Sequence, residues 1–189
     1  MKKFTFIFVI FALCFSLYGQ RNNNLVHIGF GAGLDFPTRK ISDSILHVLK
    51  STNFELGVYL RIGNKLHGQI GVYDYINQIE TKKSSASEKF SIHQIAIPIS
   101  LGYAFRMSES ARFRLFAGVR YRGIVHISNN TLSVNDAIFN KNNGDVFAGA
   151  GLSLSLLAID LSYRKAFNAL TKGSTHYQDA IHLSISVIF

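Results

Sequence analysis

Residues 112–126, RFRLFAGVRYRGIVH, alternate between apolar side chains and polar or small ones along most of their length. The odd-numbered positions include Phe113 and Leu115, whereas the even-numbered positions carry four arginines and His126. A period of two residues indicates a β-strand with an apolar face and a polar face. Four arginines on one face need water or counter-charges, because an unpaired charge is costly to bury.

Seven further segments show the same alternation. One of them contains Pro98, which removes a backbone donor from its strand. A soluble β-sandwich would show the same period, so the alternation alone does not choose between a sandwich and a barrel. The seven segments are 25–36, 54–62, 66–73, 94–105, 146–156, 159–167 and 181–189.

The connections between these segments alternate between long and short, and this feature favours a barrel in a membrane. Short periplasmic turns and longer external loops are typical of outer-membrane barrels, so both termini are expected in the periplasm. The long connections are 37–53, 77–89, 128–144 and 168–179, and the short ones are 63–65, 107–110 and 157–158.

Aromatic residues near the strand ends support the same fold, because transmembrane barrels carry aromatic girdles at both interfaces. In lipid every backbone donor must be paired, so strand 181–189 is expected to pair with strand 25–36. The sequence therefore predicts an all-β protein, an eight-stranded antiparallel up-and-down transmembrane barrel. The girdle candidates are Phe36, Phe54, Phe105, Phe113, Phe167 and Phe189.

The first 19 residues have the pattern of a cleaved signal peptide: the basic Lys2 and Lys3, an apolar run over 4–17, and a small residue at Gly19. The expected organisation is a signal peptide at 1–19 and a barrel domain at 20–189. Cleavage removes Cys14, the single cysteine, and lowers the formal charge from +9 to +7. An exported basic barrel is expected to meet anionic lipopolysaccharide and other outer-membrane lipids rather than nucleic acid.

Three stretches carry a resemblance to a known family: VHIGFGAGLDF at 26–36, IAIPISLGYAF at 95–105 and FAGVRYR at 116–122. They resemble the PorT-like outer-membrane β-barrels of Bacteroidota, which have an OmpA-like eight-stranded fold. The resemblance implies an integral protein of the cell outer membrane, and a secretion-associated role is known for one member of that family. The last strand, ending in Phe189, resembles the carboxy-terminal signal that the barrel-assembly machinery reads.

An eight-stranded barrel has an interior that side chains fill, so an open pore is not expected. The inward arginines are predicted to pair with Glu55, Asp145 and Asp160 in a structural network. The arginines outnumber these acids, so an anion or a lipid phosphate could complete the set. The inward arginines are Arg61, Arg112, Arg114, Arg120, Arg122 and Arg164.

One segment suggests catalysis: His126 and Ser128 lie two residues apart and resemble the His-x-Ser-Asn segment of outer-membrane lipid A deacylases. Such a serine needs an imidazole base and an acid that orients it. The alternation places His126 on the lumen side, and only Asp136 or Asp145 could supply the acid. The leading prediction is therefore a non-enzymatic barrel, structural or accessory to an outer-membrane assembly, with a lipid A-modifying enzyme as the alternative. The histidine spacings indicate no metal site, and no cofactor is expected.

Overall fold

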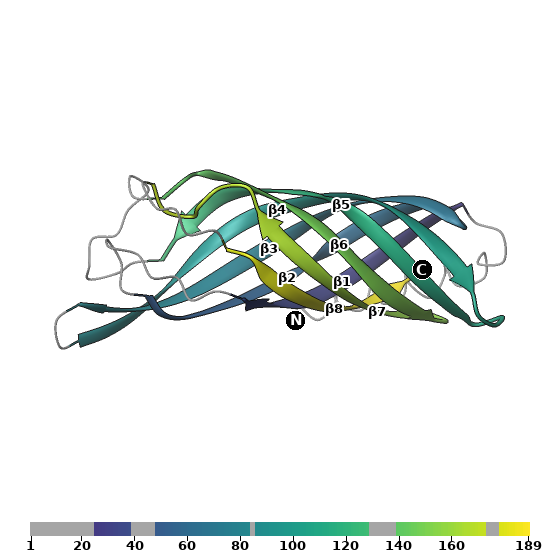
Figure 1. Ribbon diagram of the computed structural model, residues 1–189, viewed down its shortest axis with the longest axis horizontal. Coiled ribbons are helices and arrows are strands. Elements are labelled where there is room, and N and C mark those ends of the chain that lie inside the picture. Colours follow the sequence, from purple (N-terminus) through teal and green to yellow (C-terminus); the bar gives the residue numbers. More distant parts are fainter. Residues whose placement is uncertain (1–24, 39–47, 84–85, 129–138, 173–177) are drawn as a thin grey trace, which may run out of the picture.

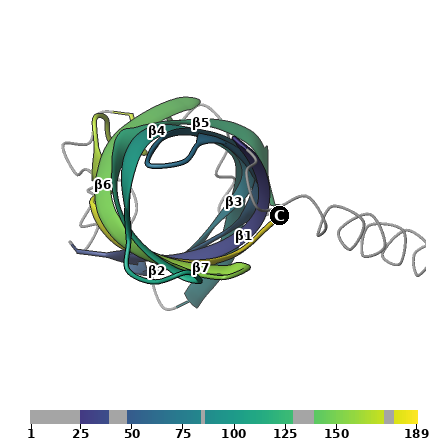
Figure 2. The ribbon, with the colours of Figure 1, turned by 90° about the vertical axis from the view of Figure 1, so that its right-hand side faces the viewer.

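The computed structural model describes residues 25–38, 48–83, 86–128, 139–172 and 178–189. These residues form eight antiparallel strands that close into one barrel (Figure 1), and an end view shows the strands as a ring (Figure 2). The predicted fold is confirmed, whereas the expected signal peptide at 1–19 lies outside the described residues. The strands are β1 (Val26–Pro37), β2 (Val48–Gly63), β3 (Leu66–Lys83), β4 (Ala86–Arg106), β5 (Ala111–Ile127), β6 (Asn142–Leu154), β7 (Leu157–Ala166) and β8 (Ala180–Ile188).

The first and last strands form the seam of the barrel, as the sequence predicts. Their pairing runs from Gly29 opposite Ile188 to Pro37 opposite Ala180. Beyond this ladder, the backbone N–H of Phe189 donates to the carbonyl of Ile28 at 2.8 Å, and the reverse bond measures 3.2 Å. Closure gives each of these strands a neighbour on both sides, which is the condition for a sheet in lipid.

The outer face of the barrel is apolar. Leu56, Leu101 and Leu161 expose 57%, 68% and 55% of their surface, whereas the neighbouring inward side chain of Glu55 is buried. This is the reverse of a soluble domain, and it suits a sheet whose outer face meets lipid. Among the described residues, no helix has the length and apolar character of a membrane span.

The outward aromatic residues gather toward the two ends of the barrel. Near the short turns, the ring of Phe105 lies 4.8 Å from that of Tyr103 and 6.2 Å from that of Phe113, between centroids. At the opposite end, Phe36 and Phe167 are exposed. This distribution agrees with the two predicted girdles.

One predicted long connection, 77–89, is wrong. β3 continues to Lys83 and β4 begins at Ala86, so most of this stretch is a paired hairpin. Outward positions such as Gln78 are polar here, and this ends the apolar alternation on which the sequence prediction relied. Backbone pairing needs no apolar side chain, so the two strands continue. The connection 37–53 is shortened in the same way, because β2 begins at Val48.

The predicted turn at 157–158 is also displaced. The turn is Ser155–Leu156, and Ser155 has a positive φ of 53°. Leu157 and Ala158 belong to β7, where they pair with β6 and with β8. The turns at 64–65 and 107–110 lie where the sequence predicts short connections.

Candidate functional site

Charged side chains cross the lumen near the end of the barrel that carries the long connections. Arg120 on β5 donates from Nε and Nη2 to the carboxylate of Asp145, at 3.1 and 2.9 Å. Its Nη1 donates to Glu55 Oε2 at 2.9 Å. Arg122 adds a 3.2 Å ion pair between its Nε and Asp145 Oδ2. Two arginines on one strand thus bind carboxylates from β2 and β6.

A second arginine centre lies beside the first. Arg164 on β7 donates from Nη1 to Asp35 Oδ1 at 2.8 Å and to Glu55 Oε2 at 2.9 Å, and from Nη2 to Glu55 Oε1 at 2.9 Å. His182 on β8 places Nδ1 2.8 Å from Asp35 Oδ1 and Nε2 3.2 Å from Glu55 Oε1. We call the set of these seven residues the lumen network: Asp35, Glu55, Arg120, Arg122, Asp145, Arg164 and His182.

The arginines and carboxylates of the lumen network balance in formal charge, because three arginines face three carboxylates. All seven side chains are buried. Buried charges are tolerated when they are paired, and each arginine of the network lies within ion-pair distance of a carboxylate. The network joins strands on opposite sides of the lumen, so it blocks the interior at this level and ties six strands together.

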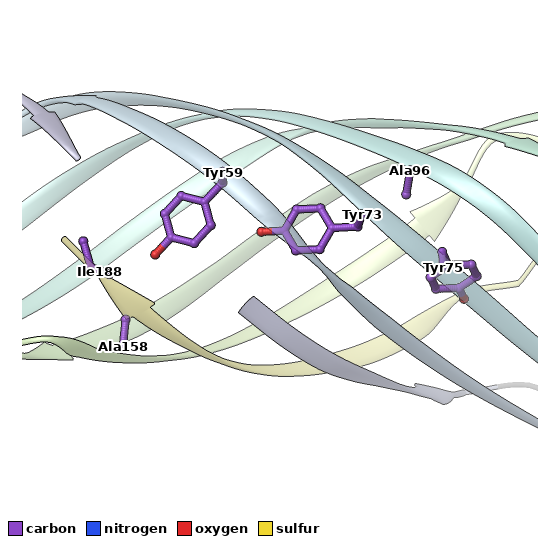
Figure 3. Close-up of a cluster of buried hydrophobic side chains, with 6 residues drawn as sticks. All are labelled: Tyr59, Tyr73, Tyr75, Ala96, Ala158 and Ile188. Carbon is purple, nitrogen blue, oxygen red and sulfur yellow. The ribbon is translucent and has the colours of Figure 1, made fainter. Parts of the chain in front are cut away.

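Three tyrosines from β2 and β3 point into the lumen (Figure 3). The hydroxyl of Tyr75 donates to Asp35 Oδ2 at 2.8 Å, and the guanidinium carbons of Arg120 and Arg122 lie 4.9 and 5.1 Å from its ring centroid. Tyr75 therefore adds cation–π contacts to the lumen network. Tyr59, farther along the barrel, shares a 3.0 Å hydrogen bond with Ser186 Oγ.

A glycine makes room for one of these rings. A Cβ built on Gly29 would overlap the ring of Tyr59, which lies across the inner face of the neighbouring strand. The lumen therefore accommodates large side chains beside positions that have none, as the glycine-rich inner face predicts.

Toward the long connections, the lumen contains an apolar cluster. It joins the β3–β4 hairpin to Phe139 and Leu170, and Phe139 also forms an isolated bridge with Thr171. The sequence does not predict this cluster, because Ile79, Phe139 and Leu170 fall in three different stretches interpreted as long connections. Its buried members are Ile79, Phe90, Ile92, Phe139 and Leu170.

The predicted pairing of inward arginines with carboxylates is confirmed for Arg114, Arg120, Arg122 and Arg164. Arg114 Nη2 lies 2.6 Å from Asp160 Oδ1, separate from the lumen network. Three members of the interior were missed: Asp35, Tyr75 and His182. Asp35 and His182 occupy polar positions of alternating segments, and this position in the sequence is the signal by which both could be assigned to the lumen. Arg61 and Arg112 do not pair with the predicted acids.

A β-bulge changes the face on which His126 lies. The pairing of β4 with β5 places His93 opposite His126 but Gln94 opposite Ile124, so Val125 is an extra residue on β5. Such an insertion reverses the alternation beyond it. An unbroken alternation through Val125, as the sequence predicts, would place His126 in the lumen.

The neighbouring pair, Ile92 and Ile127, shows to which face His93 and His126 point. Ile92 is fully buried in the apolar cluster, and its partner Ile127 packs against that cluster, so both point inward. Adjacent side chains on a strand point to opposite faces, so His93 and His126 point outward. The expected lumen position of His126 is therefore wrong. On this outer face, His93 Nδ1 lies 3.4 Å from Asp74 Oδ1, and its ring centroid lies 6.2 Å from that of His126.

The other members of the candidate catalytic set are dispersed. Ser128 Oγ accepts a 2.8 Å hydrogen bond from the backbone N–H of Ser91. Asp145 is held by Arg120 inside the barrel, on the opposite face of the sheet from His126. Asp136 lies outside the described residues. Within the described ranges, no group of three or more histidine, cysteine or acidic side chains is placed to hold a metal ion.

Comparison with known proteins agrees with this architecture. The model of one family, described as outer membrane protein beta-barrel domain, matches residues 7–189. The chain belongs to this family. The family assignment and the closed barrel make it an outer-membrane β-barrel protein. No curated protein matches the sequence.

Solved barrels share the fold at low sequence identity. The outer membrane protein OprG from Pseudomonas aeruginosa is 12% identical, with a TM-score of 0.57 over 88% of this chain and 96% of that one. Neisserial surface protein A is also 12% identical, with a TM-score of 0.50 over 87% and 97%. The outer membrane enzyme PagL is 11% identical, with a TM-score of 0.49 over 84% and 98%. These likenesses concern the fold alone.

Proposed function

We propose that this outer-membrane barrel is non-enzymatic and acts as a structural element of the outer membrane or as an accessory subunit of an outer-membrane assembly. The lumen network carries the proposal, because it fills the interior with buried, paired charges. The apolar cluster beside it occupies the lumen toward the long connections. A barrel with such an interior supplies rigidity and an outer surface rather than a passage for solutes.

The proposed orientation places the short turns and both termini in the periplasm. The start of β1 pairs with the end of β2 beside the turn at 64–65, and Phe189 lies near this end of the barrel. Short periplasmic turns are the rule for bacterial barrels. The longer connections would then face outward, toward lipopolysaccharide, and the β3–β4 hairpin would extend beyond the membrane.

The proposed partners follow from the sequence. The strand that ends in Phe189 suits recognition by the barrel-assembly machinery. The PorT-like resemblance of the stretches 26–36, 95–105 and 116–122 favours a Bacteroidota protein and an accessory role in secretion. A partner protein in the outer membrane would be the functional link, and the exposed β3–β4 hairpin is a suitable surface for it.

Planar-bilayer recording of the purified native protein tests the closed lumen. We expect no sizeable channels, because the charges of the lumen network are buried and paired across the interior. Heat-unfolded protein serves as the control for leakage caused by detergent. Regular channels from the folded protein would contradict the proposal.

The accessory role needs a separate experiment. Affinity capture from native outer membranes, followed by mass spectrometry, should recover one stable outer-membrane partner. A barrel recovered alone would instead favour the free-standing structural role.

The orientation is tested with single cysteines at Glu109 in a short turn and at Lys172 beyond β7. In intact cells an impermeant maleimide should label only the second.

A lipid A-modifying enzyme is the second candidate, and one observation favours it. Asp74 and His93 form an acid–imidazole pair on the outer face, beside His126, where acyl chains could reach them. A carboxylate beside an imidazole is the arrangement that activates a serine nucleophile. Lipid A from cells overproducing the wild type, Ser128→Ala or His93→Ala should be compared by mass spectrometry. Deacylated lipid A that both substitutions abolish would favour the enzyme over the structural role.

A further inference from the structure

The lumen widens at the end that carries the short turns. A cavity of about 530 Å³ lies there, lined by residues of all three turns and of the adjoining strand ends. We call this cavity the vestibule. Its volume falls within the range of about 300–1,000 Å³ that is usual for small-molecule sites. A smaller cavity of about 60 Å³ lies between the vestibule and the lumen network. It is lined by Glu55 and Arg164 of the network and by Arg114, which also lines the vestibule.

The charge of the vestibule is unbalanced, in contrast to the lumen network. Five cationic side chains line it against one carboxylate, which leaves four excess positive charges, or three when Asp160 is counted for its bond to Arg114. The five cations are Arg61, Lys65, Arg106, Arg112 and Arg114, and the carboxylate is Glu109. A concave wall of one charge concentrates ions of the opposite charge.

Two of these arginines are buried. Arg61 exposes 6% of its surface, and its Nε and Nη2 both donate to the neutral amide oxygen of Gln69, at 3.1 and 2.9 Å. In the part of the chain that the structure describes, no carboxylate lies within ion-pairing distance of Arg61. The guanidinium carbon of Arg61 lies 5.4 Å from the centroid of the Tyr59 ring, and Arg114 lines the same cavity. A buried cation without a counter-charge is unfavourable.

The vestibule wall also contains buried polar atoms without a partner. Ser153 exposes 8% of its surface and Arg114 3%, and neither Ser153 Oγ nor Arg114 Nε has a hydrogen-bond partner among the described residues. Both residues line the vestibule. Buried polar atoms are almost always satisfied, and the position of this hydroxyl and this guanidinium N–H in the wall of a basic cavity leaves both able to bind an acceptor in that cavity.

We propose that the vestibule binds a multiply charged oxyanion, of the class of a phosphate group on a water-soluble solute, between Arg61 and Arg114. The planar guanidinium presents a fork of donors that matches the oxygens of such an anion. The closed strands separate the vestibule from lipid, so the ligand enters from water. The binding site follows from the geometry of the barrel alone. The proposed orientation would in addition make the periplasm the compartment from which the ligand enters.

Calorimetric titration with inorganic phosphate tests the site. The folded protein is studied in a maltoside detergent, which contains no phosphate, with chloride balancing the ionic strength. We expect saturable binding of phosphate that chloride does not reproduce. Arg61→Gln should weaken it at least tenfold. Lys165→Gln, on the outer face of β7, should leave it unchanged.

A second variant covers the case in which Arg61→Gln does not fold. Arg112 is an exposed residue of the vestibule wall, so Arg112→Gln should keep the fold, as checked by the mobility shift of unheated protein in gels. It should weaken phosphate binding severalfold. Equal responses to phosphate and chloride, or wild-type affinity in both variants, would overturn the proposal. Competition by phosphatidylglycerol nanodiscs, but not by phosphatidylcholine ones, would overturn the aqueous source.

Discussion

Arg164 binds Glu55 through two parallel hydrogen bonds, Nη1 to Oε2 and Nη2 to Oε1, each 2.9 Å long. The two residues lie 109 positions apart in the chain and connect β7 to β2 through the interior of the barrel. Such a bidentate pair is among the strongest side-chain contacts, and here both charges are buried. The pair therefore holds β7 and β2 together across the interior of the barrel.

Removing one partner of this pair should destabilise the barrel strongly. We expect Arg164→Met to lower the free energy of unfolding by about 3–5 kcal/mol, because Glu55 would stay buried with part of its counter-charge lost. Urea unfolding in lipid vesicles measures the change. Lys165→Met, the outward neighbour, is the matched control and should change stability little. A loss below about 1 kcal/mol for Arg164→Met would contradict the role of the network.

Replacing Arg120 and Arg122 together by alanine should lower stability without opening a conducting pore. The double variant leaves Asp145 unpaired and removes two cation–π contacts with Tyr75, but the tyrosine rings and the apolar cluster still occupy the lumen. Unfolding in urea measures the first effect, and planar-bilayer recording measures the second. Large channels in the variant would show that the two arginines alone close the lumen.

A methyl group at Gly29 should be destabilising. Its Cβ would overlap the Tyr59 ring, and overpacking of an interior costs about 1–3 kcal/mol. Gly68→Ala is the control, because a Cβ there meets only Leu101 Cδ2 at 3.8 Å. Thermal unfolding of both variants should separate them clearly. In a Tyr59→Ser background, Gly29→Ala should cost less than it does in the wild type; an equal cost in both backgrounds would place the strain elsewhere.

Deleting Phe189 should impair assembly into the outer membrane. The deletion removes the hydrogen bonds with Ile28 at the seam and the ring contact with Phe30, whose centroid is 6.2 Å away. It also removes the aromatic end of the predicted sorting strand. Membrane fractionation and the mobility of unheated protein measure the assembled fraction. Phe189→Tyr keeps the ring and should assemble normally, and normal assembly of the deletion would refute the sorting role.

The candidate catalytic residues differ in what the sequence and the structure each reveal about them. The spacing of His126 and Ser128 is visible in the sequence, but the face they occupy is not. One extra residue, Val125, reverses the alternation, and the adjacent apolar pair Ile124 and Val125 is the local sign of this break in the sequence. Asp74 and His93, which form the outward acid–imidazole pair, lie on different strands and were not predicted to meet.

The sequence by itself determined the number of strands, the faces of their regular alternating parts and the seam between β1 and β8. These features depend on a period of two residues, which each segment shows without reference to the others. It also identified the inward arginines, such as Arg120 and Arg164, because each lies at a polar position of its own strand.

Only the tertiary structure decided which acid each arginine meets. The stagger of eight strands around a closed barrel sets the height of every side chain in the lumen, and this stagger is a property of the whole sheet. It brings Arg164 to Glu55 and Asp35 but leaves Arg61 beside a neutral glutamine. The same stagger places the balanced lumen network and the basic vestibule at different levels of the barrel. Each is built from side chains of several strands, so neither can be recognised in a single segment of the sequence.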